Sequence, residues 1–361
     1  MNDHKIINVT KPFLPPIEEY ISYVEEIWKT NILTNNGPLV VKLEEKLKQF
    51  LNLNNLYITN NGTIPLQIAL RALEVEGEVI TTPFSYVATL NSLLWDKIQP
   101  VFVDIDESTF CIDAKKIEEK ITSKTTAILA VHVYGIPCDV EGIEKVANKY
   151  NLKVIYDAAH AFGVKFKNRS LLSFGDVSTV SFHATKLFHT AEGGAIVAEN
   201  IELNNKIMLL RQFGHIQDEY FLPGINAKIS ELQAAMGLAC MTHINQIISK
   251  RKLLCDYYDA ELEGRILRPV ISSNIEYNYS YYPVIFNSEN ALLQTMKLLM
   301  NSNIFPRRYF YPSLNTLPFL SKKQPCEISE SISKRVLCLP LSYDLSESDI
   351  DLIVGIIKKT V

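Results

Sequence analysis

Residues 127–159 read AILAVHVYGIPCDVEGIEKVANKYNLKVIYDAA. The segment AILAVHVYG is continuously apolar, VEGIEKVANKY has the spacing of an amphipathic helix, and KVIYDAA is apolar again. Continuous apolar strands that alternate with amphipathic helices are typical of a parallel sheet covered by helices on both faces. The segment therefore predicts a strand, a helix and a second strand of such a sheet.

The same alternation extends through residues 39–200, which predicts an α/β domain with a mostly parallel sheet. From residue 225 to residue 262 the pattern becomes mostly helical, and one more strand and two helices follow. We therefore expect an N-terminal segment and a large domain in residues 1–240. Residues 241–361 would form a linking helix and a smaller C-terminal α+β domain. No GxGxxG follows the first strand, so a dinucleotide-binding fold is not expected.

Composition excludes several classes of protein. The chain has 361 residues, of which 47% are hydrophobic, and its net charge of −4 makes nucleic acid an unexpected partner. The six cysteines form no CxxC pair, so neither a metal site nor a redox pair is predicted. The first sixteen residues lack the apolar core of a signal peptide, and no run of 18 apolar residues predicts a membrane span. A cytoplasmic location is the expectation.

Lys186 lies in the segment SFHATKLFHTAEGGAI (residues 181–196), in a polar turn between two apolar strands. An ordinary surface lysine is the alternative, but a desolvated lysine has a lowered pKa and can act as a nucleophile or base. Asp157 follows another apolar strand, at the edge of an α/β sheet where ligands bind. Its carboxylate could either cap a helix or hold a pyridinium nitrogen.

Three further features suit one cofactor, although each has an ordinary structural explanation. Gly62 and Thr63 open a predicted helix, where free amides suit a phosphate, and Ser181 could add a hydroxyl. Tyr86 follows a strand and could stack on a flat ring. A phosphate cradle, a ring stacker, a carboxylate and a lysine are together what pyridoxal 5′-phosphate requires.

Four blocks of the sequence resemble the DegT/StrS family of sugar aminotransferases, and the resemblance covers nearly the whole chain. They are LTNNGPLVVKLEE, YDAAHAFG, SFHATKLFHTAEGG and GINAKISELQAAMG. The resemblance implies the aspartate aminotransferase (type I) fold. It also implies that Lys186 forms the Schiff base, that Asp157 binds the pyridine nitrogen and that His160 contacts the 3-hydroxyl of the ring. Asn226 would reach the phosphate of the neighbouring subunit, which implies a homodimer with shared active sites.

Residues that would contact the substrate are less sharply indicated. His183 and Glu192 flank the lysine. The segment PRRYFYPSL (residues 306–314) resembles a stretch that the family places over its active site. Its Arg307, Arg308 and Tyr309 could bind the carboxylate of the amino donor or the diphosphate of a sugar nucleotide.

The resemblance implies a transaminase that moves an amino group from L-glutamate to a nucleotide-linked keto-deoxysugar. It is greatest to members that convert dTDP-4-keto-6-deoxyglucose to dTDP-4-amino-4,6-dideoxyglucose for polysaccharides of the O-antigen type. Amination at C3 of a dTDP-3-keto-6-deoxyhexose needs nearly the same residues and stays open. Dehydratases of the family carry histidine in place of the lysine, so Lys186 argues against them. The Lys186–Asp157 pair argues against a non-catalytic regulatory relative.

Overall fold

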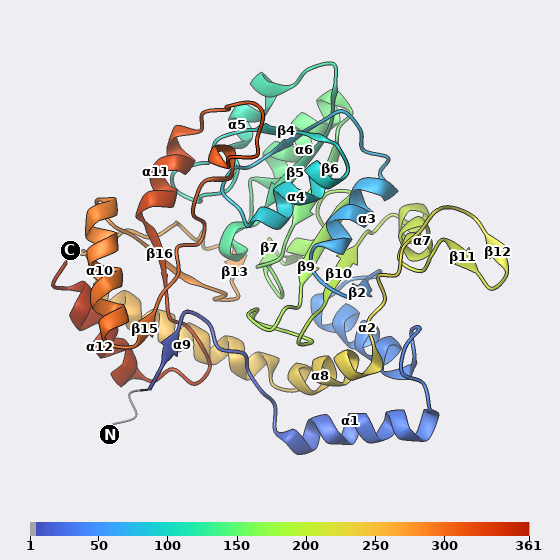
Figure 1. Ribbon diagram of the computed structural model, residues 1–361, viewed down its shortest axis with the longest axis horizontal. Coiled ribbons are helices and arrows are strands. Elements are labelled where there is room, and N and C mark those ends of the chain that lie inside the picture. Colours follow the sequence, from blue (N-terminus) through green and yellow to red (C-terminus); the bar gives the residue numbers. More distant parts are fainter. Residues whose placement is uncertain (1–4, 361) are drawn as a thin grey trace.

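A seven-stranded sheet lies at the centre of the structure, a computed structural model that describes residues 5–360 (Figure 1). Its strands, in spatial order, are β2 (Tyr57–Thr59), β10 (Gly194–Val197), β9 (Val177–Ser181), β6 (Lys153–Asp157), β5 (Thr125–Val131), β3 (Glu78–Thr81) and β4 (Gln99–Phe102). All of them run in the same direction except β10, which is antiparallel to both neighbours. The predicted mostly parallel sheet is confirmed.

Both faces of this sheet are buried, which explains why its strands are apolar throughout. In β5, Ala127 and Leu129 belong to one core cluster, whereas Ile128 and Ala130 belong to another. Successive side chains of a strand point to opposite faces, so a strand between two helical layers needs apolar residues at every position. The helices that supply these layers include α2 (Pro38–Leu51), α3 (Ile64–Ala72), α6 (Val140–Tyr150), α7 (Ile201–Leu210) and α8 (Glu231–Met241).

Further elements surround the sheet. The helices are α1 (Ile17–Thr30), α4 (Val87–Trp95) and α5 (Ala114–Ile117). A three-stranded sheet contains β13 (Ile275–Glu276), β7 (Lys165–Phe166) and β8 (Arg169–Ser170). A hairpin of β11 (His215–Ile216) and β12 (Glu219–Tyr220) projects from the body beside α7 (Figure 1).

The C-terminal elements have a core of their own, which includes Leu254, Tyr258, Tyr282, Leu337 and Ile353. These elements are α9 (Ile244–Leu262), β14 (Tyr282–Ile285), α10 (Glu289–Asn301), β15 (Ile304–Phe305), α11 (Glu327–Arg335), β16 (Val336–Leu339) and α12 (Glu347–Ile357). Strands β14 and β16 pair antiparallel. The domain division at residues 240 and 241 stays a prediction. The N-terminal strand β1 (Ile7–Asn8) pairs in parallel with β15 and so lies with the C-terminal elements.

The helix expected from residue 225 onward begins instead at Glu231. Ser230 accepts a hydrogen bond from the backbone N–H of Gln233, and the Gln233 side chain accepts one from the backbone of Ser230. This capping box fixes the N-terminal start of the helix. Residues 225–230 therefore precede the helix, and Asn226 forms a β-bridge with Gln212.

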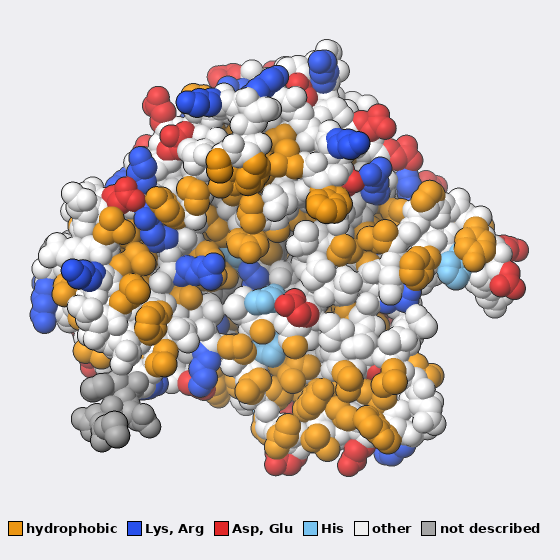
Figure 2. All heavy atoms as spheres, in the orientation of Figure 1, with side chains coloured by type: hydrophobic (Ala, Val, Ile, Leu, Met, Phe, Trp, Pro, Cys, Tyr) orange, Lys and Arg blue, Asp and Glu red, His pale blue; other side chains and the backbone are white. Residues whose placement is uncertain are grey.

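Large apolar side chains are exposed on two separate features. Figure 2 shows hydrophobic atoms gathered over α1, where Ile17 and Trp28 are 61% and 70% exposed. The hairpin and the segment after it expose Tyr220, Phe221 and Ile225. Exposed apolar patches are typical of interaction sites. No helix among residues 5–360 is both long enough and apolar enough to cross a bilayer.

Gly194 starts β10 at a point where three backbones approach one another. A Cβ atom added here would lie 2.4 Å from the carbonyl oxygen of Asn61 and 2.7 Å from that of Val180. Because both contacts are with backbone, no side-chain rotation could relieve them. The antiparallel strand can be inserted between β2 and β9 at this spacing only if this position is glycine.

The variant Gly194→Ala should therefore lower the free energy of unfolding by about 1–3 kcal/mol, the usual cost of forcing an extra carbon into a packed site. Gly355→Ala is the matched control, because a Cβ there meets nothing within 4 Å in helix α12. That change should stabilise the protein by about 0.5–1 kcal/mol, since alanine favours helix. Urea unfolding of both variants measures the difference; equal midpoints for the two would contradict this account.

Candidate active site

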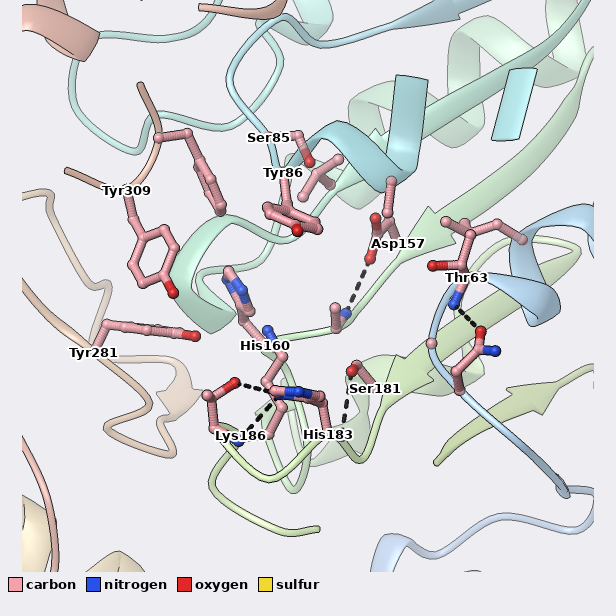
Figure 3. A pocket seen from close by; sticks show the side chains of 18 of the residues that line it. Thr63, Ser85, Tyr86, Asp157, His160, Ser181, His183, Lys186, Tyr281 and Tyr309 are labelled. Carbon is pink, nitrogen blue, oxygen red and sulfur yellow. Dashed lines mark hydrogen bonds between the residues drawn. The ribbon is translucent and has the colours of Figure 1, made fainter. Parts of the chain in front are cut away.

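One cavity of about 270 Å³ opens at the carboxyl ends of the parallel strands and collects most of the residues predicted from the sequence. Figure 3 shows their side chains converging on it from several elements. Those that line it are Gly62, Thr63, Tyr86, Asp157, His160, Ser181, His183, Lys186, Glu192, Arg307 and Tyr309. Asn226 and Arg308 are not among the residues that line the cavity.

Lys186 is presented by a closed loop between β9 and β10. The backbone N–H of Phe182 bonds the carbonyl of Gly193 (2.8 Å), and that of Ala184 bonds Ala191 (2.7 Å). The Phe182 ring packs edge-on against Phe188, with 4.9 Å between ring centroids. The apolar anchors fix the base of the loop, so that the lysine at its tip extends into the cavity.

Burial lowers the pKa of the Lys186 ammonium to about 8. The carboxylate of Asp157 opposes this shift because it attracts the charged form. Burial also raises the pKa of Asp157 above its ordinary value, while a hydrogen bond from Thr89 works against the rise. A lysine with this pKa is a competent nucleophile and proton carrier near neutral pH.

Asp157 ends strand β6 with both carboxylate oxygens engaged. Its Oδ2 accepts a hydrogen bond from the Thr89 hydroxyl (2.7 Å), and its Oδ1 accepts one from the backbone N–H of Ala159 (3.1 Å). The side chain is almost completely buried, so these two donors fix its orientation. The helix-capping alternative does not apply, because no helix directly follows Asp157 and the Ala159 bond closes only a local turn.

His160 is held as a neutral imidazole. Its Nδ1 accepts a hydrogen bond from the backbone N–H of Tyr134 (3.2 Å), so the ring hydrogen lies on Nε2. Burial keeps the pKa of this histidine well below its usual value. The ring also packs against Tyr281 and Phe310, with centroid distances of 4.7 and 5.6 Å. His160 is therefore a fixed hydrogen-bond donor at the cavity wall.

The predicted phosphate turn is closer packed than the sequence suggested. Asn61 Oδ1 accepts hydrogen bonds from the N–H groups of Thr63 and Ile64, at 2.8 and 2.9 Å. The amide of Thr63 is thus already bonded, and its hydroxyl is the group that remains for a ligand. Gly62 packs against Ser181, where a Cβ would lie 2.7 Å from Ser181 Cβ. The glycine lets the two candidate phosphate-binding elements lie side by side.

The C-terminal elements complete one wall of the cavity. Tyr281, Arg307, Tyr309 and Phe310 all line it. The Arg307 guanidinium lies over the Tyr309 ring at 4.8 Å, and the Tyr309 ring packs edge-on against Tyr281 at 5.6 Å. This wall brings one guanidinium and two phenols to face Lys186.

At the rim, His183 pairs with Glu192. His183 Nδ1 accepts a hydrogen bond from the backbone N–H of Thr185 (3.2 Å), and its Nε2 lies 3.4 Å from Glu192 Oε1. The pair is about half exposed. The pair borders the cavity entrance beside Lys186. The structure therefore places His183 at the cavity, as predicted, but does not show what it binds.

Arg308 and Asn226, which were also predicted to belong to the site, lie outside this cavity. Arg308 forms an ion pair with Glu289 (2.6 Å) and bonds the carbonyl of Lys334 (3.1 Å). It therefore ties the segment to α10 and α11. Asn226 is exposed beside the apolar Ile225, outside the cavity of its own chain.

Sequence reasoning missed several residues that line or support the cavity. Thr89 lies three positions after Tyr86 on a predicted helix, and this spacing could have pointed to a shared face. Ser85 and Asn61 flank residues that the sequence did indicate. Tyr281 gave no signal, because it lies in an apolar strand-like segment far along the chain.

The donor set fits pyridoxal 5′-phosphate. One cavity is surrounded by a partly buried lysine of lowered pKa, a buried carboxylate, a neutral histidine donor and hydroxyl groups beside a glycine. The lysine matches the aldehyde of that molecule, the carboxylate its ring nitrogen, the histidine its ring oxygen and the hydroxyls its phosphate.

Comparison with known proteins identifies the family of the chain. The sequence profile of the DegT/DnrJ/EryC1/StrS aminotransferase family matches residues 16–358. A dTDP-4-amino-4,6-dideoxy-D-glucose transaminase of Shigella dysenteriae is 46% identical over 98% of this chain and 99% of its own. An Escherichia coli transaminase of the same name is 43% identical over 99% and 98%.

Solved structures agree with the fold. The structure of DesI with its TDP-sugar product has a TM-score of 0.93 at 29% identity, and covers 98% of this chain and 92% of that one. PseC of Helicobacter pylori, an aminotransferase involved in the biosynthesis of pseudoaminic acid, has a TM-score of 0.92 at 27% identity over 99% of both chains. The α/β aminotransferase fold expected from the sequence is confirmed.

Lys186 should react with an amine-acylating reagent with a midpoint near pH 8, because only the neutral amine attacks and burial lowers its pKa to about 8. The measurement is mass-spectrometric quantification of the Lys186 peptide across a pH series, in protein stripped of cofactor. Asp157→Asn should move the midpoint to lower pH, since it removes the charge that favours the ammonium. An upward shift in that variant, or the ordinary lysine midpoint in the unmodified protein, would contradict the electrostatic account.

Proposed function

The chain belongs to the DegT/DnrJ/EryC1/StrS aminotransferase family, and we propose that it is a pyridoxal 5′-phosphate-dependent transaminase of nucleotide sugars. L-Glutamate is the proposed amino donor and dTDP-4-keto-6-deoxyglucose the acceptor, which gives dTDP-4-amino-4,6-dideoxyglucose. The names and high identity of the Shigella and Escherichia coli relatives support this acceptor. The proposed setting is the cytoplasm, in the biosynthesis of polysaccharides of the O-antigen type.

One observation carries the proposal: a partly buried Lys186 of lowered pKa shares a cavity with a buried Asp157. Two such groups are costly to bury without a ligand that uses both. Pyridoxal 5′-phosphate, when bound, supplies an electron sink for amino-group transfer. In this proposal Lys186 anchors the cofactor and carries the proton, and Asp157 holds the ring nitrogen.

The other cavity residues orient the cofactor. His160 Nε2–H is directed at the ring oxygen, and Tyr86 covers one face of the ring. Thr63, Ser181 and the turn at Gly62 receive the phosphate. These roles follow from the donors that the structure leaves available at each place.

Arg307 is the proposed anion-binding residue on the substrate side. It is the arginine that lines the cavity, whereas Arg308 is already paired with Glu289. A guanidinium suits either the carboxylate of glutamate or the diphosphate of the sugar nucleotide. Tyr309 and His183 lie at the same entrance and are proposed to contact the sugar nucleotide.

A homodimer with shared active sites is part of the proposal. The exposed apolar surface of α1 and the β11–β12 hairpin suits a symmetric contact with a second copy. Asn226 lies exposed within this surface region and does not line its own cavity. We assign it to the phosphate of the partner subunit.

Incubation with L-glutamate and dTDP-4-keto-6-deoxyglucose should give an amine at C4 of the sugar, located by NMR. The isomeric 3-keto sugar should be a poor acceptor, because one or two hydrogen bonds set which carbon faces the cofactor, and each contributes about 1–2 kcal/mol. Lys186→Ala is the inactive control. Turnover of the 3-keto sugar alone would replace C4 with C3 amination, and turnover of only a UDP-linked ketosugar would correct the nucleotide.

Mixing Lys186→Ala with Asn226→Trp should restore part of the activity, because one site of each heterodimer then has an intact lysine and an intact asparagine. Mixing Lys186→Ala with Asp157→Asn is the control. Those two residues line one cavity in the same chain, so every site of that heterodimer keeps one defect. Turnover after subunit exchange is the readout. Equal recovery in both mixtures, or none in the first, would end the shared-site assignment.

A further inference from the structure

The Asp157 carboxylate is joined to the cavity by a second, unbroken path of hydroxyl groups. Thr89 Oγ1 donates to Asp157 Oδ2 at 2.7 Å, and the same Thr89 oxygen lies 2.7 Å from Ser85 Oγ. Thr89 is completely buried and Ser85 is 3% exposed. Ser85 also lines the cavity.

The direction of the hydrogen bonds in this path follows from counting hydrogens. A threonine hydroxyl has one hydrogen, and an ionised Asp157 can only accept. With the Thr89 hydrogen on Asp157, the short contact between the two hydroxyls requires Ser85 to be the donor. While the carboxylate is ionised, the hydrogen bonds therefore run from Ser85 to Thr89 to Asp157. If a protonated Asp157 donated to Thr89 instead, both hydrogen bonds would reverse.

Both hydroxyls of the path come from the start of helix α4 and the residues just before it. Helix α4 begins at Val87 directly after Tyr86, and the N–H of Thr89 bonds the Tyr86 carbonyl at 3.2 Å. The first turn of α4 thus places the exposed Tyr86 ring at the cavity and the Thr89 hydroxyl on the carboxylate behind it. The same turn therefore positions both the Tyr86 ring, which is proposed to stack on the cofactor, and the carboxylate of Asp157.

We propose that Thr89, oriented by Ser85, is the positioning residue that keeps Asp157 ionised and aimed at the ring nitrogen of the cofactor. This inference rests on the proposed function. It concerns residues that do not themselves touch the ring, and it deepens that function by naming what tunes the acid.

The physical reason is the cost of burying a carboxylate. Burial raises the pKa of Asp157, and the Thr89 hydrogen bond, the Ala159 N–H and the charge of Lys186 lower it. Lys186 acts on Asp157 through its charge and not through a hydrogen bond. Thr89 is then the remaining side-chain donor to Asp157, so its loss should favour the protonated acid, which attracts a pyridinium less.

The test compares the binding of two cofactors by the full-length protein. One is pyridoxal 5′-phosphate, and the other is its 1-deaza analogue, which has carbon in place of the ring nitrogen. Thr89→Val keeps the side-chain shape but lacks the hydroxyl. It should weaken binding of pyridoxal 5′-phosphate about tenfold, the lower end expected for a hydrogen bond to a charged group, and change binding of the analogue much less. Dissociation constants come from fluorescence quenching, without turnover.

Two companion variants make the result specific. Thr89→Ser retains the hydroxyl and should bind pyridoxal 5′-phosphate within about threefold of the unmodified protein. Ser85→Ala removes only the outer donor and should have an effect smaller than that of Thr89→Val. In an Asp157→Asn background, Thr89→Val should add no further loss, because the two residues act through one contact.

Each result has a distinct meaning. Equal weakening of both cofactors in Thr89→Val would show a packing role and overturn the inference. Unchanged binding of pyridoxal 5′-phosphate in Thr89→Val would overturn it as well. Absence of binding by the unmodified protein would instead overturn the proposed function, so the two failures are distinguishable.

Discussion

The close approach of three backbones at Gly194 is the constraint on which the cavity depends. The antiparallel strand β10 lies between β2 and β9, with Gly194 opposite both Thr59 and Ser181. This spacing brings the turn at residues 60–63 beside the end of β9, and it starts and closes the loop that carries Lys186. A wider gap at this point would separate the candidate phosphate-binding groups from the lysine, although each segment would keep its own local structure.

The interior of the cavity balances two buried charges against a small number of fixed donors. Lys186 and Asp157 are each destabilised by burial, and each partly relieves the other through a charge interaction. Neutral groups surround the candidate ring and phosphate positions, because further charges there would require still more compensation, whereas the charged Arg307 and Glu192 line other parts of the cavity. The structure accordingly uses a histidine held in one tautomer, and hydroxyls in place of cations, around the candidate ring and phosphate positions.

Much of the fold and half of the site can be predicted from the sequence, for reasons that differ between residues. The run AILAVHV is apolar at every position because both faces of β5 are covered, and that signal is local. Lys186 and Asp157 end or follow such strands, so their common edge is predictable. Tyr281 reaches the cavity through the packing of distant elements, which no local pattern records, and Arg307 is indicated only by the family resemblance of its segment. Arg308 has the same sequence context as Arg307, yet the alternation of neighbouring side chains turns it to Glu289.

The parallel pairing of β1 with β15 has a consequence for the order in which the chain can assemble. Ile7 lies opposite Ile304, so the two strands of this small sheet come from opposite ends of the sequence. During synthesis β1 leaves the ribosome first and must wait for almost the entire chain before its partner exists. Until then it is an unpaired strand edge, a feature open to pairing with other chains. Pairing of β1 with β15 joins residues far apart in the sequence, and such contacts form slowly because they close large loops. The N-terminal strand therefore completes the C-terminal core late in folding.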